Sequence, residues 1–408
     1  MITNWKKNVT IFMISQGLTL LGSMLAYYAI FWHITLTTQS GMMMLLFTLV
    51  QALPMFFMSP FGGVWADRYN KKHLINIADG VIAITTLFMA IMFSLGFEYI
   101  ALLLVCGAVR SFGQGVQTPA VGAIIPEIVP EEKLIKVNGL NSSIQYFIMF
   151  LSPIIAGGLL ALVGLEVLLF IDVITAAIGI TLLYFFVQTK KTEKKKEEEH
   201  YFKELVEGIK YAAKNTFIKK FLVVSAIFNI MICPMAILSP LHVTRAFGPE
   251  VWRLSVLEAF FFIGAMLGGL LIGTWGGFKN KVHTLALASV LSGLGGFLLG
   301  FSTNFFIFII IMGLIGIFMG MFNPPLTSIL QVRVDKAFMG RIFSLLAMVS
   351  SLIMPLAMVL WGPLSDKVKL DYIFIFTGVA IALTGLFFLY DKTMLKAGDF
   401  SDLEEVKE

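Results

Sequence analysis

The sequence predicts an all-α membrane protein with twelve transmembrane helices in two pseudo-symmetric six-helix halves. Composition is the first observation behind this prediction. Hydrophobic residues make up 58% of the 408 residues and charged residues 13%, and the mean hydropathy is +0.88. A soluble domain carries about twice that charged share. The other two observations are apolar runs of spanning length and basic residues gathered in alternate loops.

The apolar runs define the expected helices. The first covers about residues 9–36 and follows Lys6 and Lys7. It is too long for a signal-peptide core and lacks a small-residue cleavage site, so we expect an uncleaved first span. Eleven further runs cover about 41–63, 74–95, 98–120, 139–162, 167–188, 221–243, 254–275, 284–302, 304–327, 340–362 and 371–391.

The distribution of basic residues predicts the orientation. With twelve spans, the loops alternate between the two sides of the membrane. The side that holds both termini carries 25 Lys and Arg residues, and the opposite side carries four. Cytoplasmic loops are enriched in Lys and Arg. We therefore expect a multi-pass protein of the bacterial inner membrane with both termini in the cytoplasm.

The spans fall into two groups of six. The predicted organisation is a half over 1–189, a cytoplasmic linker over 190–220, a second half over 221–392 and a cytoplasmic tail over 393–408. The linker carries ten lysines. Its apolar residues recur at helical spacing, which predicts an amphipathic helix on the inner membrane surface: Phe202, Leu205, Val206, Ile209 and Ala213. We favour a solvated spacer over a regulatory segment.

The two halves resemble each other in sequence. One set of residues recurs 210 positions later: Trp65, Asn70, Lys71 and His73 become Trp275, Asn280, Lys281 and His283. Gly115-x-x-x-Pro119 recurs 205 positions later as Gly320-x-x-x-Pro324. This pattern is typical of transporters built from repeats. Two charges lack a counterpart, because Gly277 corresponds to Asp67 and Ile315 to Arg110.

A short polar stretch, residues 62–73, lies between the second and third runs. Its charges place it at the water–membrane interface, and its two glycines predict a tight hinge with close helix approach. The pattern is Gly63-x-x-x-Asp67-Arg68-x-x-Lys71-Lys72. It resembles the loop between helices 2 and 3 of the major facilitator superfamily. Asn70 stands where that motif has its second glycine, and asparagine tolerates a left-handed backbone.

The resemblance implies a gate. In this family the motif aspartate engages the start of span 11, which here is the Gly340–Arg341 region. The expected gating residues are Gly63, Asp67, Arg68, Lys71, Lys72, Gly340 and Arg341. Residues 152–158 also resemble the Gly-Pro-x-x-Gly-Gly element of drug antiporters, which kinks a helix and gives it a smooth face.

The whole chain resembles bacterial macrolide-efflux permeases of the drug:proton antiporter group. The residues that carry this resemblance are Trp5-Lys6-Lys7, Gln117-Thr118-Pro119-Ala120 and Gly340-Arg341-Ile342-Phe343-Ser344-Leu345. It implies export of an amphipathic small molecule in exchange for protons by alternating access. Such relatives handle macrolides, siderophores and lipids, so an exporter or flippase of an endogenous lipid or siderophore remains the alternative.

Ionisable side chains inside spans are costly, so they are candidate working residues. Arg110, Asp172 and Glu258 are the proton-coupling candidates. Asp79 lies two turns beyond Lys72 and is interpreted as a structural partner of the inner gate. The candidate substrate-binding residues are polar side chains in mid-span: Gln16, Gln117, Asn229 and Asn323.

Several function classes are not supported by the sequence. No Gly-x-x-x-x-Gly-Lys-Ser/Thr loop occurs, so we expect no ATP hydrolysis by this chain, although an ATP-binding-cassette partner stays compatible. No nucleophile–base pair or metal-ligand spacing appears, and Cys106 and Cys233 lie in apolar runs. We expect a monomer without enzyme activity, cofactor, metal or nucleic acid. Its partners are a small amphipathic substrate, protons and the lipid bilayer. A non-transporting sensor is the alternative from another class.

Overall fold

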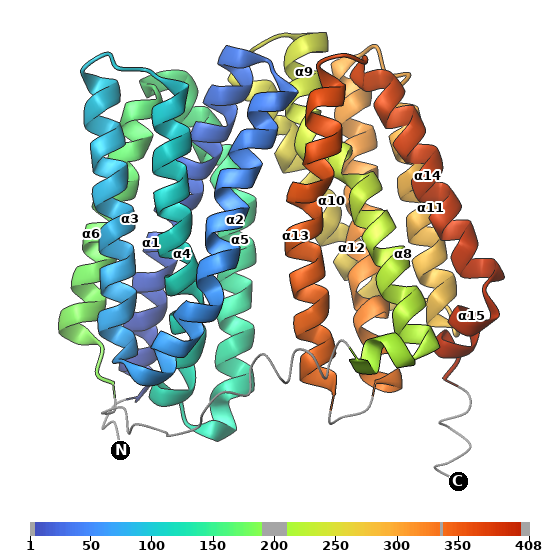
Figure 1. Ribbon diagram of the computed structural model, residues 1–408, viewed down its shortest axis with the longest axis horizontal. Helices are drawn as coiled ribbons and strands as arrows, with labels where there is room; N and C mark the ends of the chain where they lie inside the picture. Colours follow the sequence, from blue (N-terminus) through green and yellow to red (C-terminus); the bar gives the residue numbers. More distant parts are fainter. Residues whose placement is uncertain (1–4, 190–209, 335–337, 401–408) are drawn as a thin grey trace. The chain divides into compact units, whose positions relative to one another are not determined.

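The computed structural model describes residues 5–189, 210–334 and 338–400, and every regular element among them is a helix (Figure 1). Eleven described helices are long and apolar enough to cross a membrane. The helix expected as span 11 also forms, and its described apolar part is Ser351–Ser365. Each of the twelve apolar runs corresponds to a helix or to a helix series, which confirms the predicted fold class.

Six long helices form from the first half of the chain. They are α1 (Trp5–Thr38), α2 (Gly41–Arg68), α3 (Lys71–Ser94), α4 (Ile100–Ile128), α5 (Leu134–Val163) and α6 (Leu165–Phe186), with a short 3₁₀ turn at Glu131–Lys133 before α5. Several extend beyond the apolar runs, because polar residues at the membrane surface continue the helix.

The second half repeats this series. Its elements are α8 (Thr216–Cys233), a π-helical turn (Pro234–Leu238), α9 (Ser239–Phe247), α10 (Val251–Trp275), α11 (Lys281–Leu299), α12 (Phe305–Arg333), α13 (Met339–Ser365), α14 (Leu370–Tyr390) and α15 (Lys392–Gly398). The seventh span is thus interrupted in the middle. Of the predicted linker helix, 190–209 lies outside the described residues, and 210–214 is helical.

By its internal contacts the chain divides into two compact units. The N-terminal unit comprises Met1–Gln39, Leu46–Glu197 and Glu250–Ser255; the C-terminal unit comprises Ser40–Leu45, Glu198–Pro249 and Val256–Glu408. The first turn of α2 therefore groups with the C-terminal unit, and the first turn of α10 groups with the N-terminal unit. The sequence boundaries near 189 and 221 remain predictions.

The same helix pairs pack in both units. In the N-terminal unit α1 contacts α5 and α6, and α3 contacts α4 and α6. In the C-terminal unit α8 contacts α13 and α14, and α11 contacts α12 and α14. These pairs correspond one to one, which confirms the internal repeat.

Repeated residues also have the same local role. Asn70 begins α3 and Asn280 begins α11, each with an extended backbone and a side chain that accepts a hydrogen bond from the first turn. Asn70 does not use the left-handed backbone that asparagine tolerates, because its φ is −66°. An extended asparagine satisfies backbone N–H groups that the helix itself leaves free.

The repeated glycines mark close helix contacts. A Cβ on Gly115 of α4 would lie 2.8 Å from the Met55 carbonyl oxygen of α2. A Cβ on Gly320 of α12 would collide with the backbone of Ala265 in α10. Both positions therefore require glycine, and they join equivalent helix pairs in the two units.

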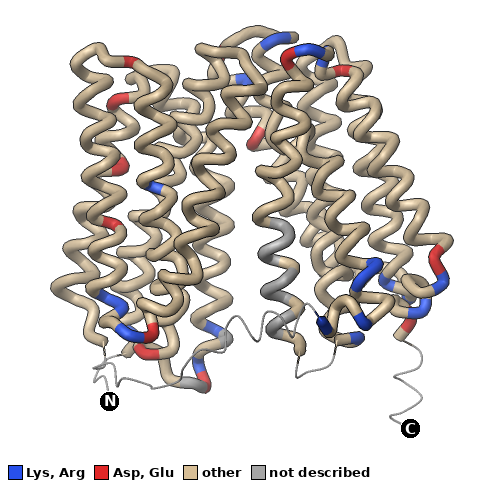
Figure 2. Tube along the Cα trace, in the orientation of Figure 1, with Lys and Arg blue, Asp and Glu red and all other residues tan. Residues whose placement is uncertain are grey.

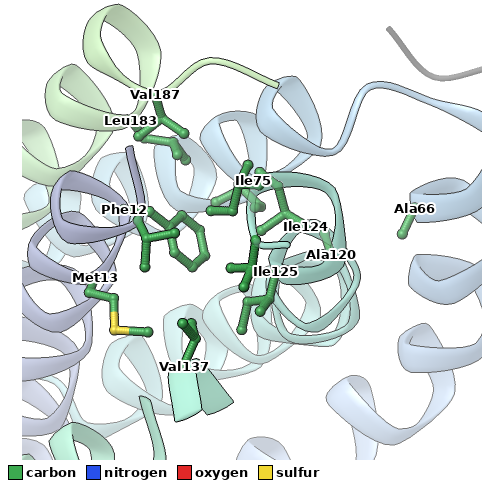
Figure 3. Packing of buried hydrophobic residues seen from close by; sticks show 13 residues of the cluster. Phe12, Met13, Ala66, Ile75, Ala120, Ile124, Ile125, Val137, Leu183 and Val187 are labelled. Carbon is green, nitrogen blue, oxygen red and sulfur yellow. The ribbon is translucent and has the colours of Figure 1, made fainter. Parts of the chain in front are cut away.

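An apolar cluster closes one end of the N-terminal unit. Figure 3 shows Phe12 of α1 facing Ile75 of α3 and Ile124 of α4, with Val137 and Leu183 from α5 and α6 nearby. Phe12 and Ile75 are fully buried. Burial of such side chains stabilises the packing of five helices at this end by about 1.5–3 kcal/mol for each side chain.

An aspartate anchors the first turn of α2 within the C-terminal unit. Asp366, directly after α13, accepts hydrogen bonds from the backbone N–H groups of Gly41 at 2.7 Å and Met42 at 3.0 Å. The Ser40 hydroxyl donates to it at 2.9 Å, and the Arg245 guanidinium at 2.7 Å. Partial burial opposes ionisation of Asp366, but these hydrogen bonds outweigh it and hold its pKa below the ordinary value.

We predict that Asp366→Ala lowers the stability of the detergent-solubilised protein by about 1–3 kcal/mol at pH 7, because a helix N-terminus loses its acceptor. A depressed folded-state pKa contributes stability that is present above about pH 4 and is lost as the pH falls through the folded-state pKa. Thermal unfolding followed by circular dichroism should show this difference shrinking below pH 4. Glu250→Ala, at an exposed acid, is the control, and a pH-independent difference would contradict the assignment.

Candidate functional site: a buried polar network in the N-terminal unit

Charged residues cluster near the ends of the helices, and only a few lie at intermediate depth (Figure 2). Arg110 of α4 and Asp172 of α6 are both deeply buried, with exposed fractions of 3% and 0%. The Arg110 guanidinium lies 2.5 Å from the carboxylate of Asp172. An arginine cannot lose its proton in a protein, so this position requires a buried anion.

Two hydroxyl groups complete the surroundings of the Asp172 carboxylate. The Thr86 hydroxyl of α3 lies 3.0 Å from Oδ2 and also contacts the Arg110 guanidinium. The Ser23 hydroxyl of α1 donates to Oδ1 at 3.3 Å. Four helices thus contribute to one buried ion pair, and both carboxylate oxygens have partners.

A second polar layer lies among the same helices. The Gln117 amide of α4 donates to the Gln16 side-chain oxygen of α1 at 3.1 Å. The Gln117 side chain also interacts with the carboxyl group of Asp79 of α3. Two of the four predicted substrate-binding residues are therefore brought together, next to an acid that we had interpreted as a gate residue.

Several atoms of this layer have no partner among the described residues. They are Oδ2 of Asp79, Nε2 of Gln16 and both polar side-chain atoms of Asn76. Asp79 does not pair with Lys72, whose ammonium group donates instead to the Val187 carbonyl at 2.7 Å. Lys72 therefore does not link Asp79 to the inner gate, and the interpretation of Asp79 as a structural partner of that gate stays a prediction.

The gating stretch is more helical than we expected. Helix α2 continues to Arg68 and α3 begins at Lys71, so only two residues separate them. Close approach depends on Gly62, where a Cβ would lie 2.5 Å from the Gly115 carbonyl oxygen of α4, whereas Gly63 faces open space. The predicted hinge was therefore too long, because it is limited to the two residues between the helices. The close helix contact is made at Gly62 and not at Gly63.

The charged residues of this stretch differ in exposure and in their contacts. Lys71 forms an ion pair with Glu127 at 2.6 Å. Asp67 and Arg68 are exposed and have no hydrogen-bond or ion-pair partner among the described residues. Gly340 and Arg341 fall in the first turn of α13, as predicted for the start of span 11, but their side chains lie outside the described part of the structure. The contact of Asp67 with the start of span 11 therefore stays a prediction.

The candidates in the C-terminal unit are not brought together by hydrogen bonds. Asn229 donates to the Ser225 carbonyl one turn earlier in α8, and Asn323 is exposed on α12. Glu258 of α10 has no hydrogen-bond or ion-pair partner among the described residues. No cluster of three metal-ligating side chains occurs in the described ranges.

A cavity of about 340 Å³ opens at the other end of the N-terminal unit, lined among others by His33, Glu98 and Glu166. It contains none of the predicted site residues. The buried polar network therefore depends on helix packing and not on this cavity.

Sequence reasoning missed the hydroxyl groups and Asn76. Thr86 and Ser23 are ordinary residues of membrane helices, so their types alone carry no signal. The available signal was spacing: Lys72, Asn76, Asp79 and Thr86 recur on one face of α3. The Pro234–Leu238 turn was also missed, although Pro234 and Pro240 could have indicated a break.

Known proteins share this architecture. Macrolide efflux protein A of Streptococcus pyogenes is 26% identical over 93% of this chain and 94% of its own length. A protein of the same name from Enterococcus faecalis is 27% identical over 78% of this chain and 99% of its own length. A bacterial homologue of the iron transporter ferroportin superposes with a TM-score of 0.71 at 15% identity, covering 94% of this chain and 98% of the other.

The model of the Major Facilitator Superfamily matches residues 9–357 and 221–399, which together cover most of the chain. The helix pairs described above recur in both halves, as a repeat-built transporter requires. The relatives and the fold are those of transporters and not of enzymes. The chain therefore belongs to the Major Facilitator Superfamily, as a multi-pass membrane transporter.

Proposed function

We propose that this protein is a secondary active exporter that moves an amphipathic, macrolide-like small molecule out of the bacterial cytoplasm in exchange for protons. The observation that carries the proposal is the buried network around Arg110, Asp172 and Asp79. Similarity to macrolide efflux proteins over nearly the full chain supports the substrate class.

Proton coupling is supported by the cost of buried acids. A charged side chain in a transmembrane helix costs at least about 2.5–3.5 kcal/mol, so such residues mark ion or proton pathways. Arg110, Asp172 and Glu258 form the proposed coupling set. Arg110 and Asp172 act as a fixed pair, whereas Glu258 lies in the other unit without a partner among the described residues.

The proposed orientation places the amino terminus of α3 in the cytoplasm, because 25 basic residues lie in loops on that side. Asp67 would then stand at the cytoplasmic mouth, with its carboxylate exposed. A helix N-terminus attracts an anion through its free N–H groups and partial positive charge. We propose that Asp67 engages the first turn of α13 at Gly340 and Arg341 and holds the cytoplasmic gate shut.

Purified protein in liposomes should accumulate erythromycin when a pH gradient is imposed, in the absence of nucleotide. The expected direction is into vesicles whose interior is acidic, for protein molecules whose cytoplasmic face points outward. A protonophore should abolish the accumulation. Uptake that appears only with ATP would sink the proposal.

Asp67→Asn should insert and fold normally but export more slowly, because the gate loses a bias of about 1–3 kcal/mol. Single cysteines placed along α4 and α12 should react faster with a thiol reagent from the cytoplasmic side. Gly277→Asp should not restore the wild-type behaviour, since Gly277 has a φ of +77° that side chains disfavour. Unchanged labelling and export would reduce the stretch to a topology signal.

Asp172→Asn should destabilise the protein by about 3–5 kcal/mol, because Arg110 would lose its buried counter-charge. The double variant Asp172→Asn, Arg110→Gln should recover much of this loss, since no charge then remains in the pair. Circular dichroism during thermal unfolding measures both effects. Additive destabilisation in the double variant would contradict a direct ion pair.

A further inference from the structure

We infer that Asp79 is the residue of the N-terminal unit that takes up and releases the coupling proton, and that Asp172 stays ionised throughout. The inference rests on the proposed proton exchange and assigns its carrier. It reverses the expected roles of the two acids, since Asp172 was the sequence candidate and Asp79 was interpreted as structural.

Asp172 is unsuited to exchange a proton in this arrangement. Its Oδ2 lies against the Arg110 guanidinium and the Thr86 hydroxyl, and its Oδ1 accepts from Ser23. A proton on this carboxylate would displace the contact at 2.5 Å and leave a permanent positive charge uncompensated at 3% exposure. Arg110 cannot release that charge by losing a proton.

Among the described residues, Asp79 is an acid of this network that has no ion-pair partner. The charged residue that acts on Asp79 is Asp172 of α6, another acid, which is itself bound to the guanidinium of Arg110 of α4. Helix α1 contributes the uncharged Gln16, which accepts a hydrogen bond from Gln117. On α3 itself Lys72 is bound to the Val187 carbonyl. A carboxylate that is 5% exposed and lacks a counter-charge is costly when ionised and tolerable when neutral.

The free atom of Asp79 is correctly placed to hold the proton. Gln117 interacts with the carboxyl group, while its buried Oδ2 has no hydrogen-bond partner among the described residues. A proton on Oδ2 makes the group neutral without displacing any existing hydrogen bond. Release breaks only this O–H bond and transfers the proton to water, and no other bond changes.

A polar face of α3 connects Asp79 with the helix end that we assign to the cytoplasm. Lys72, Asn76 and Asp79 follow one another at helical spacing, over about 10 Å at 1.5 Å per residue. Both polar side-chain atoms of Asn76 lack partners among the described residues and could each bind water. Phe12 and Ile75, one turn closer to this end than Gln16 and Asp79, belong to the apolar cluster (Figure 3). Asn76 thus places a polar side chain at the depth along α3 where the apolar cluster lies.

The test compares two transport modes in liposomes with erythromycin as the probe. Counterflow exchange of labelled for unlabelled erythromycin needs no net proton movement, whereas accumulation driven by a pH gradient does. We expect Asp79→Asn to keep counterflow within about twofold of wild type and to lose at least tenfold in pH-driven accumulation. Glu250→Gln, at an exposed acid, is the control and should keep both modes.

A second variant separates coupling from structure. Asp79→Glu keeps an ionisable group and should retain pH-driven accumulation with a shifted pH dependence. Normal accumulation by Asp79→Asn, an unshifted pH profile in Asp79→Glu, or loss of counterflow together with accumulation in Asp79→Asn would each overturn the assignment. Absence of pH-driven accumulation in the wild-type protein would instead overturn the proposed function, and this inference with it.

Discussion

A guanidinium buried among helices is tolerable only when an anion lies against it, because its desolvation costs several kcal/mol and it cannot be neutralised. Arg110 imposes this condition on the N-terminal unit. The condition fixes Asp172 on α6 and draws in hydroxyl groups from α1 and α3. Four helices are thereby held in register by one charge. A second acid, Asp79, has no ion-pair partner among the described residues, and this difference between the two acids is the basis of the role that we propose for Asp79.

The two units share their helix pairing but not this chemistry. Ile315 corresponds to Arg110 and is fully buried in apolar contacts on α12. Two consecutive glycines, Gly276 and Gly277, end α10 in left-handed conformations, whereas α2 continues as a helix through Asp67. At these two equivalent positions, the C-terminal unit therefore has neither the buried cation nor the acid of the helix end. The repeat accounts for the shared helix packing, whereas Arg110 and Asp67 occur in the first copy and have no charged equivalent in the second.

The sequence was sufficient for the helices, the repeat and the charged residues of the network, but not for its hydroxyl groups. Long apolar runs predict spans because unpaired backbone groups are too costly in lipid. It was not sufficient for partners: nothing in the chain order tells that Lys72 bonds Val187 or that Arg110 selects Asp172 over Asp79. Those choices depend on helix rotation, which single residues do not encode. Gly62 and Gly63 show the same limit. Which of them contacts α4 depends on the side of α2 that faces α4, and the sequence does not specify that side.

The anchor between Asp366 and α2 has a consequence for how the protein is made. Gly41 and its acceptor are 325 residues apart in the chain. When the first half leaves the ribosome, the free N–H groups at the start of α2 have no acceptor, since α13 is still to be synthesised. The first turn of α2 groups with the C-terminal unit and that of α10 with the N-terminal unit. The contact of Gly41 and Met42 with Asp366 can therefore form only after the chain has been synthesised through α13.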